Sequence, residues 1–319
     1  MTEYEVALPF WLDRPDREAM DVALAAAEAG VGAVWVGEMA TYDAFALATA
    51  IGLRAPGIDL KIGPLPVGVR TPAGLALGLN TVASLTGSRV DLALGASSPV
   101  IVMGWHDRKW ANHVSVMRET IECLRSMFTG ARVDYVGQHV SSRGFRLRDK
   151  RPETRIALGA FGPQMIRLAA QHADEVVLNL ATPERVTDVR AGIDSVAAAA
   201  DRDPPRLTVW VPAALDPGDA AHAQLAAQLA VYLGPPGYGE MFSDLGFAEL
   251  VQSARTGATR RELAAAIPVD LLDRVCALGS ADRIEAQLRA YRQAGADCVA
   301  VVPATAQDPA GRNVLRALT

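Results

Sequence analysis

The feature that most constrains the fold is an alternation of short apolar runs with helix-like stretches, repeated eight times along the chain. The apolar runs are continuous, which is typical of strands that are covered on both faces, as in parallel sheets. Eight repeats in 319 residues favour an α/β fold of the (β/α)8 TIM barrel type over a doubly wound open sheet, which usually has fewer repeats. The expected strands span residues 4–9, 33–37, 60–63, 89–94, 156–159, 175–180, 207–212 and 297–302.

Several expected helices have recognisable starts between these runs. Asp16 and Asp43 stand at N-cap positions, and Thr71 is a cap followed by Pro72 at the first helical position. Residues 131–147 are expected to form a hairpin with Gly137 at its turn. Residues 231–268, which begin with a dense Gly/Pro turn signal, are expected to be a partly helical insertion after the seventh strand. No shift in composition marks a second domain, so we expect residues 1–319 to form a single barrel domain that contains this insertion.

Composition argues against several classes of protein. The formal net charge of −5 disfavours nucleic acid as the main partner. No window reaches the ~20 apolar residues of a membrane span, and the chain starts with acidic residues where a signal peptide would be basic. The three cysteines are far apart, and no metal-binding histidine pattern is present. We therefore expect a cytoplasmic protein with neither a structural metal nor a disulfide.

The fourth expected strand opens into small residues with free hydroxyls, namely Gly95, Ala96, Ser97 and Ser98. Barrels bind ligands at the C-terminal ends of their strands. Small residues let a ligand approach the backbone, and the hydroxyls can donate hydrogen bonds to it. This segment therefore predicts a cofactor-binding loop, with an ordinary strand-to-loop turn as the alternative.

A second candidate loop follows the fifth expected strand and opens a helix. Its candidate cofactor-binding residues are Gly159, Ala160, Gly162 and Gln164. Free N–H groups and a positive partial charge make a helix N-terminus a phosphate site. Pro163 has no N–H, so Gly162 and Gln164 would be the donors. The alternative is a plain turn with proline at its usual helical position.

Two residues are candidate catalytic groups. Glu38 follows an apolar strand, and because an unpaired buried carboxylate is costly, it should transfer a proton or form a salt bridge with Arg70 or Arg89. His106 is a candidate proton donor because imidazole is the side chain that most readily exchanges protons near neutral pH. A rim histidine without a catalytic role is the alternative for His106.

Four apolar side chains after expected strands could wall a substrate pocket: Phe10, Trp11, Met39 and Trp105. Phe10 and Trp11 could equally pack the mouth of the barrel. Residues 231–268 are expected to shape or cover the same pocket.

Four segments resemble the luciferase-like monooxygenase superfamily, and within it the actinobacterial branch that uses the deazaflavin coenzyme F420. They are residues 8–14 (LPFWLDR), 35–39 (WVGEM), 62–70 (IGPLPVGVR) and 92–102 (LALGASSPVIV). The resemblance implies a barrel, a homodimer, and hydride transfer at C5 of the deazaflavin. It also implies that the loop of residues 159–164 helps to hold the coenzyme's phosphate.

The resemblance further places Gly63 and Pro64 at a bulge with a cis peptide beneath the flavin-like ring. In many members the cis bond is non-prolyl, whereas here either Pro64 or Pro66 could follow it, or both bonds could be trans. Six cations between residues 143 and 155 could steer the coenzyme's polyglutamate tail, although such a run is more often a solvated face.

We therefore expect an F420-dependent oxidoreductase that acts on a small organic substrate, which the sequence does not identify. An FMN-dependent monooxygenase on the same barrel is the alternative among enzymes. A carrier or sensor that binds F420 without catalysis is the alternative from another class of protein. It stays open because the sequence offers few candidate acid or base residues for catalysis.

Overall fold

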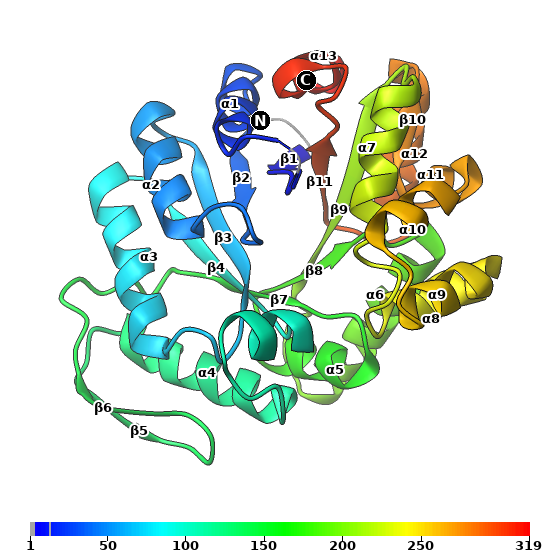
Figure 1. Ribbon diagram of the computed structural model, residues 1–319. Helices are drawn as coiled ribbons and strands as arrows, with labels where there is room; N and C mark the ends of the chain where they lie inside the picture. The colour runs from blue at the N-terminus through cyan, green and yellow to red at the C-terminus, as the bar shows by residue number, and fades with distance from the viewer. Residues whose placement is uncertain (1–3, 13) are drawn as a thin grey trace. The chain divides into compact units, whose positions relative to one another are not determined.

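The computed structural model describes residues 4–12 and 14–319 (Figure 1). The chain divides into two compact units. One unit contains residues 1–31, 178–190 and 208–319, and the other contains residues 32–177 and 191–207. We call them the first and the second unit and describe each by itself. The acidic start at residues 1–3 and Asp13 of the LPFWLDR segment lie outside the described residues.

The second unit holds a run of parallel strands that pair in chain order: β2 (Ala33–Val36), β3 (Asp59–Pro66), β4 (Val90–Gly95), β7 (Ile156–Gly159) and the start of β8 (Glu175–Asn179). Helices follow these strands: α2 (Ala44–Arg54), α3 (Pro72–Thr86), α4 (His113–Phe128), α5 (Pro163–His172) and α6 (Pro183–Ala199), of which residues 191–199 belong to this unit. Each crossover is a βα unit, so the C-terminal ends of neighbouring strands lie at the same edge.

The first unit pairs its strands in the order β10 (Ala277–Gly279), β9 (Arg206–Leu215), β11 (Cys298–Pro303) and β1 (Tyr4–Ala7). Its longer helices are α1 (Arg17–Glu28), α7 (Asp219–Leu229) and α12 (Ala281–Gln293). Short helices fill the rest: α8 (Tyr238–Phe242), α9 (Ala248–Arg255), α10 (Arg260–Ala266), α11 (Val269–Val275), α13 (Arg312–Ala317), and the turns η2 (Ser243–Phe247) and η3 (Pro309–Gly311). Residues 231–268 are therefore partly helical, as the sequence predicts. None of the helices among the described residues is long and apolar enough to cross a membrane.

All eight predicted strands are present, and the fold is the predicted (β/α)8 barrel. Three details differ from the prediction. β10 was not predicted, because a strand of three residues leaves too short a pattern. β3 continues through both prolines to Pro66, and the segment after Ser98 is a π-helical turn, η1 (Val100–Trp105), rather than a loop.

Local signals account for several helix starts. Asp43 Oδ1 accepts a hydrogen bond from Ala46 N at 2.9 Å, and Thr71 Oγ1 accepts one from Gly74 N at 3.1 Å. The prediction for Asp16 is correct in position, since α1 begins at the next residue, but its side chain makes no capping bond.

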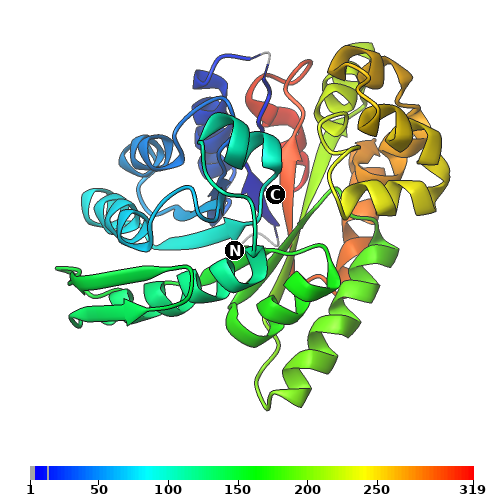
Figure 2. The same cartoon turned by 60° about the horizontal axis from the view of Figure 1, so that its bottom comes forward.

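The predicted hairpin is present as β5 (Val133–Val136) and β6 (Ser141–Phe145), closed by a bond from Gly137 N to Val140 O at 2.8 Å. It lies outside α3 and α4 in two views (Figures 1 and 2). Glu119 of α4 accepts three backbone N–H bonds from the turn, at residues 138, 139 and 140. Burial raises the pKa of Glu119, but these bonds outweigh it, so the pKa lies below its usual value.

A buried ion pair crosses the sheet of the second unit. Lys61 Nζ lies 2.9 Å from both carboxylate oxygens of Glu175 and 4.5 Å from the ring centroid of Trp35. Both charged side chains are almost fully buried, so each depends on the other to offset the loss of hydration.

Candidate active site

The bulge in β3 is the structural centre of the site. The register of β3 against β4 shifts between Ile62 and Leu65, and the Gly63–Pro64 peptide bond is cis. The prediction that one of the two prolines follows a cis bond is therefore confirmed for Pro64. Gly63 has φ +125°, and a Cβ at this position would overlap the carbonyl group of Ala93. Only glycine fits here, because an L side chain is both strained at this φ and blocked by backbone.

Three strand ends meet at the ring of Pro64. A Cβ at Gly95, the end of β4, would lie 3.3 Å from Pro64 Cβ. A Cβ at Gly159, the end of β7, would lie 3.6 Å from Pro64 Cγ. The predicted residues Gly63, Pro64, Gly95 and Gly159 therefore form one platform of small residues, which we call the glycine platform.

The loop that leaves β4 carries free hydroxyls beside this platform. Ser97 is exposed and has φ +63°, a left-handed conformation that is uncommon for a residue with a side chain. Within the described chain, the hydroxyls of Ser97 and Ser98 make no hydrogen bond, so both are available to a ligand. The carbonyl of Ala96 accepts a 3.2 Å bond from the indole Nε1 of Trp110. Sequence reasoning missed Trp110, although a second tryptophan in a polar stretch was a usable signal.

The N-terminus of α5 is open. Gly162 is its N-cap, with extended backbone at φ −86° and no side-chain capping bond. A Cβ at Gly162 would meet nothing within 4 Å, and Gln164 is exposed, whereas Ala160 is buried. Uncapped N–H groups facing open space are the donor set that a phosphate group requires.

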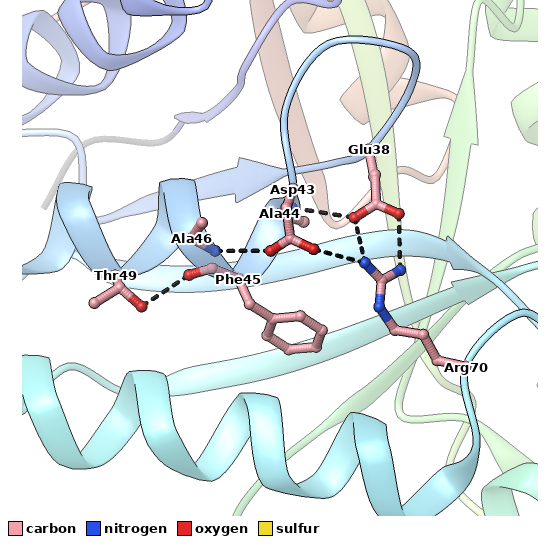
Figure 3. Close-up of polar contacts among 7 residues, drawn as sticks. All are labelled: Glu38, Asp43, Ala44, Phe45, Ala46, Thr49 and Arg70. Carbon is pink, nitrogen blue, oxygen red and sulfur yellow. Dashed lines mark hydrogen bonds and ion pairs between the residues drawn. The ribbon is translucent and has the colours of Figure 1, made fainter.

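Glu38 is held in an ion-pair cluster with Arg70 and Asp43 (Figure 3). Arg70 donates to Glu38 Oε1 at 2.7 Å and to Oε2 at 2.8 Å, and it donates to Asp43 Oδ2 at 2.8 Å. Ala44 N also donates to Glu38 Oε2, at 3.1 Å. The hydrogen bond to Glu38 is the main reason that the pKa of Arg70 lies above its usual value.

Of the two partners considered for Glu38, Arg70 is therefore the one observed. Arg89 instead lies 3.4 Å from Asp91. Because both oxygens of Glu38 are engaged, the cluster ties the loop after β2 to the loop after β3. No pattern in the sequence indicated that Asp43 would share Arg70, because Asp43 stood out only as a helix cap.

The remaining predicted residues lie in different surroundings. Trp105 is the last residue of η1 and is 51% exposed, and His106, which follows it, is also exposed. Met39 is half-buried after β2. Phe10 and Trp11 belong to the first unit, where the Phe10 ring lies 6.4 Å from that of Trp210 and Trp11 is buried. The second unit thus brings together the predicted cofactor residues, while the roles of Phe10 and Trp11 stay predictions.

The basic run between residues 143 and 155 is separate from this cluster. Arg155 directly precedes β7, and its N–H donates to Oδ1 of Asp91, which lies at the start of β4, at 3.0 Å. Arg146 Nε donates to the carbonyl of Gly130, just after α4 ends. These contacts put the run at the starts of the strands, whereas the glycine platform and Ser97 lie at their ends. The run therefore lies away from the predicted cofactor loops, and its role in steering the coenzyme's tail stays a prediction.

The chain is similar to several known proteins. The chain is 25% identical to a protein of Mycobacterium tuberculosis named as a coenzyme F420-dependent oxidoreductase, over 94% of each chain. The coenzyme F420-dependent tetrahydromethanopterin reductase of Methanopyrus kandleri superposes with a TM-score of 0.80 at 18% identity, over 99% of this chain and 97% of that chain. An F420-dependent secondary alcohol dehydrogenase in complex with an F420–acetone adduct gives the same TM-score at 17% identity, over 100% and 99%. These superpositions show the shared fold.

The model of the luciferase-like monooxygenase family matches residues 10–298. This range includes every residue of the platform, the α5 N-terminus, and residues 95–98, which we call the serine loop. The family resemblance drawn from the sequence is thus confirmed, and the chain belongs to the luciferase-like monooxygenase family.

Proposed function

We propose that this chain is a coenzyme F420-dependent oxidoreductase that transfers a hydride between the deazaflavin and an organic substrate. Two relatives with this cofactor in their names support the choice: the mycobacterial oxidoreductase and the methanogen reductase. When bound, the coenzyme supplies the hydride chemistry at C5 of its ring, and the protein supplies binding and orientation.

The single observation that carries the proposal is the glycine platform. Gly63, Gly95 and Gly159 come from three strands and surround one proline ring, so these three positions add no side chain to the surface there. Such a surface suits one face of the flat three-ring deazaflavin, because the ring system must lie close to the protein over a wide area. The free hydroxyls of Ser97 and Ser98 would then donate to the ring's oxygens or side chain, and Gly162 N and Gln164 N would receive the phosphate.

Glu38 and His106 have different parts in this proposal. His106 is exposed on the η1 side of the serine loop and is able to exchange a proton with a substrate. Glu38 has both oxygens bound to Arg70, so we assign it to holding the loops after β2 and β3. Met39 and Trp105 would contact the substrate. The substrate itself is not identified by these residues.

The test is a set of separate titrations of the purified protein with F420, FMN and NADPH, followed by fluorescence or absorbance. Binding of F420 at low micromolar concentration, with no binding of FMN, supports the proposal. Co-purified FMN would favour the monooxygenase alternative. Tight F420 binding with no turnover across a broad panel of alcohols, carbonyl compounds and enones would favour a carrier or sensor. Absence of F420 binding would refute the proposal.

We further propose a homodimer and one barrel domain for residues 1–319. Three leucines on α2 and α3, Leu53, Leu77 and Leu85, are more than half exposed, and α2 packs against α3. Exposed apolar side chains gathered on neighbouring helices are typical of a subunit interface. Light scattering coupled to size-exclusion chromatography measures the mass, and a 33.7 kDa species would refute the dimer. The cytoplasmic location stays a prediction.

A further inference from the structure

The segment between η1 and α4 presents two cations without a carboxylate partner. Arg108 and Lys109 are both exposed, and within the described chain neither forms an ion pair. Among the described residues, the Arg108 side chain donates to the carbonyl of Asp107 alone, at 3.2 Å. By contrast, Arg70, Arg118 and Arg125 of the same unit are each paired with an acid. Arg108 and Lys109 are therefore free to bind an external anion.

The same segment is tied to the serine loop. Trp110, the next residue after Lys109, donates through its indole to the carbonyl of Ala96, which directly precedes Ser97. Arg108 N donates to the carbonyl of Val102 in η1 at 3.0 Å, and the ring of Trp110 lies 4.1 Å from that of His113 at the start of α4. The two cations are thus fixed close to the hydroxyls of the proposed cofactor loop.

The neighbouring surface also favours anions. β4 pairs directly with β7, so the helices that follow them, α4 and α5, begin at the same edge of the sheet. Neither helix has an acidic residue in its first turn, and α5 is uncapped. Asp107 is the one carboxylate between residues 106 and 112. The first turns of α4 and α5 and residues 106–112 therefore carry a single carboxylate, Asp107, beside the two cations.

We propose that Arg108 and Lys109 bind the anionic tail of coenzyme F420, which consists of a phosphodiester followed by glutamate carboxylates. This inference rests on the proposed function, and it adds a second binding subsite outside the ring and phosphate contacts. Each contact is solvent-exposed, so the subsite contributes modestly and is sensitive to salt. It replaces the distant basic run of residues 143–155 as the surface that recognises the tail.

The experiment compares the dissociation constants of three ligands by fluorescence titration: long-tailed F420, short-tailed F420, and the deazaflavin chromophore without phosphate or glutamates. The variant is the double substitution Arg108→Glu and Lys109→Glu. The matched control is Arg146→Glu with Arg148→Glu, which makes the same change of charge on the hairpin side. Circular dichroism and Tm establish that both variants are folded.

At low salt, the Arg108/Lys109 variant should bind long-tailed F420 about tenfold more weakly, while the control changes less than about twofold. The loss should be smaller for the short tail, absent for the tail-free chromophore, and largely abolished at ~0.5 M salt. Equal affinity of wild type and variant for long-tailed F420 would overturn the proposal while leaving the proposed function intact. Equal losses for all three ligands, or equal losses in the control, would also overturn it. Failure of the wild type to bind F420 would refute both proposals.

Discussion

Substituting Gly63 by alanine tests whether the glycine platform is built as described. Gly63 has φ +125° and is buried. An added Cβ would overlap the carbonyl of Ala93 in β4 and lie 2.8 Å from Leu65 N. Both obstacles are backbone, so no side-chain rotation relieves them. β3 and β4 would have to separate at the point where Val67 N donates to Gly95 O at 2.9 Å.

The expected cost follows from these contacts. Forcing an L residue into this region of φ costs about 1–3 kcal/mol, and overpacking against a fixed neighbour adds about 1–3 kcal/mol. A loss of about 4 kcal/mol in the free energy of unfolding is therefore expected. The unfolding entropy is about 2.1 cal/mol/K per residue. For 319 residues, each kcal/mol lost from the free energy of unfolding therefore lowers the Tm by about 1.5 °C. The expected fall in Tm is about 6 °C.

The assay is thermal unfolding followed by circular dichroism, in parallel with F420 titration. Gly162→Ala is the matched control, because φ at Gly162 is −86° and an added Cβ would meet nothing within 4 Å. This control should keep the wild-type Tm within about 1 °C and weaken F420 binding alone. A Gly63→Ala variant with the wild-type Tm would refute the description of the platform. So would a Gly162→Ala variant as unstable as Gly63→Ala.

Three further predictions concern charged groups of the second unit. Glu38→Gln should lower the free energy of unfolding by about 1 kcal/mol. Arg70→Met should lower it by more, because loss of Arg70 leaves the carboxylates of Glu38 and Asp43 facing each other. A double-mutant cycle that gives no coupling energy between Glu38 and Arg70 would contradict the cluster. Lys61→Met should lower the free energy of unfolding by about 3–5 kcal/mol, because it removes the cation that lies against the buried Glu175 carboxylate. The double substitution Lys61→Met with Glu175→Leu should recover most of this loss, as measured by urea unfolding. Burial lowers the pKa of His113 in the folded protein below the usual value of 6.5. As the pH falls through 6.5, the unfolded chain therefore binds a proton at His113 before the folded chain does. The free energy of unfolding should decline below that pH. His113→Gln should flatten this part of the Tm-against-pH curve, and an unchanged curve would show that His113 makes no such contribution.

The fold could be predicted from the sequence because its determinants are local and repeated. Continuous apolar runs identify strands buried on both faces, and the caps at Asp43 and Thr71 start helices through side-chain bonds that span three residues. The serine loop and the α5 N-terminus were also predictable, because in a parallel barrel the end of a strand fixes where its loop lies. β10 was not predicted, because a strand of three residues has no periodic pattern. It forms because its residues pair with the end of β9.

Contacts between distant residues were decided by tertiary structure alone. Glu38 had two candidate cations in the sequence, and only the packing of the loops after β2 and β3 selected Arg70 over Arg89. The basic run of residues 143–155 was plausible as a tail site by charge, but its position at the starts of the strands depends on how the hairpin packs on α3 and α4. The pairing of Trp110 with Ala96 likewise requires a π-helical turn that no local pattern specified. The sequence thus determines which segments are strands, helices and ligand loops, because those depend on neighbouring residues. The three-dimensional structure decides which charges meet, because ion pairs depend on separations in space that the chain order does not encode.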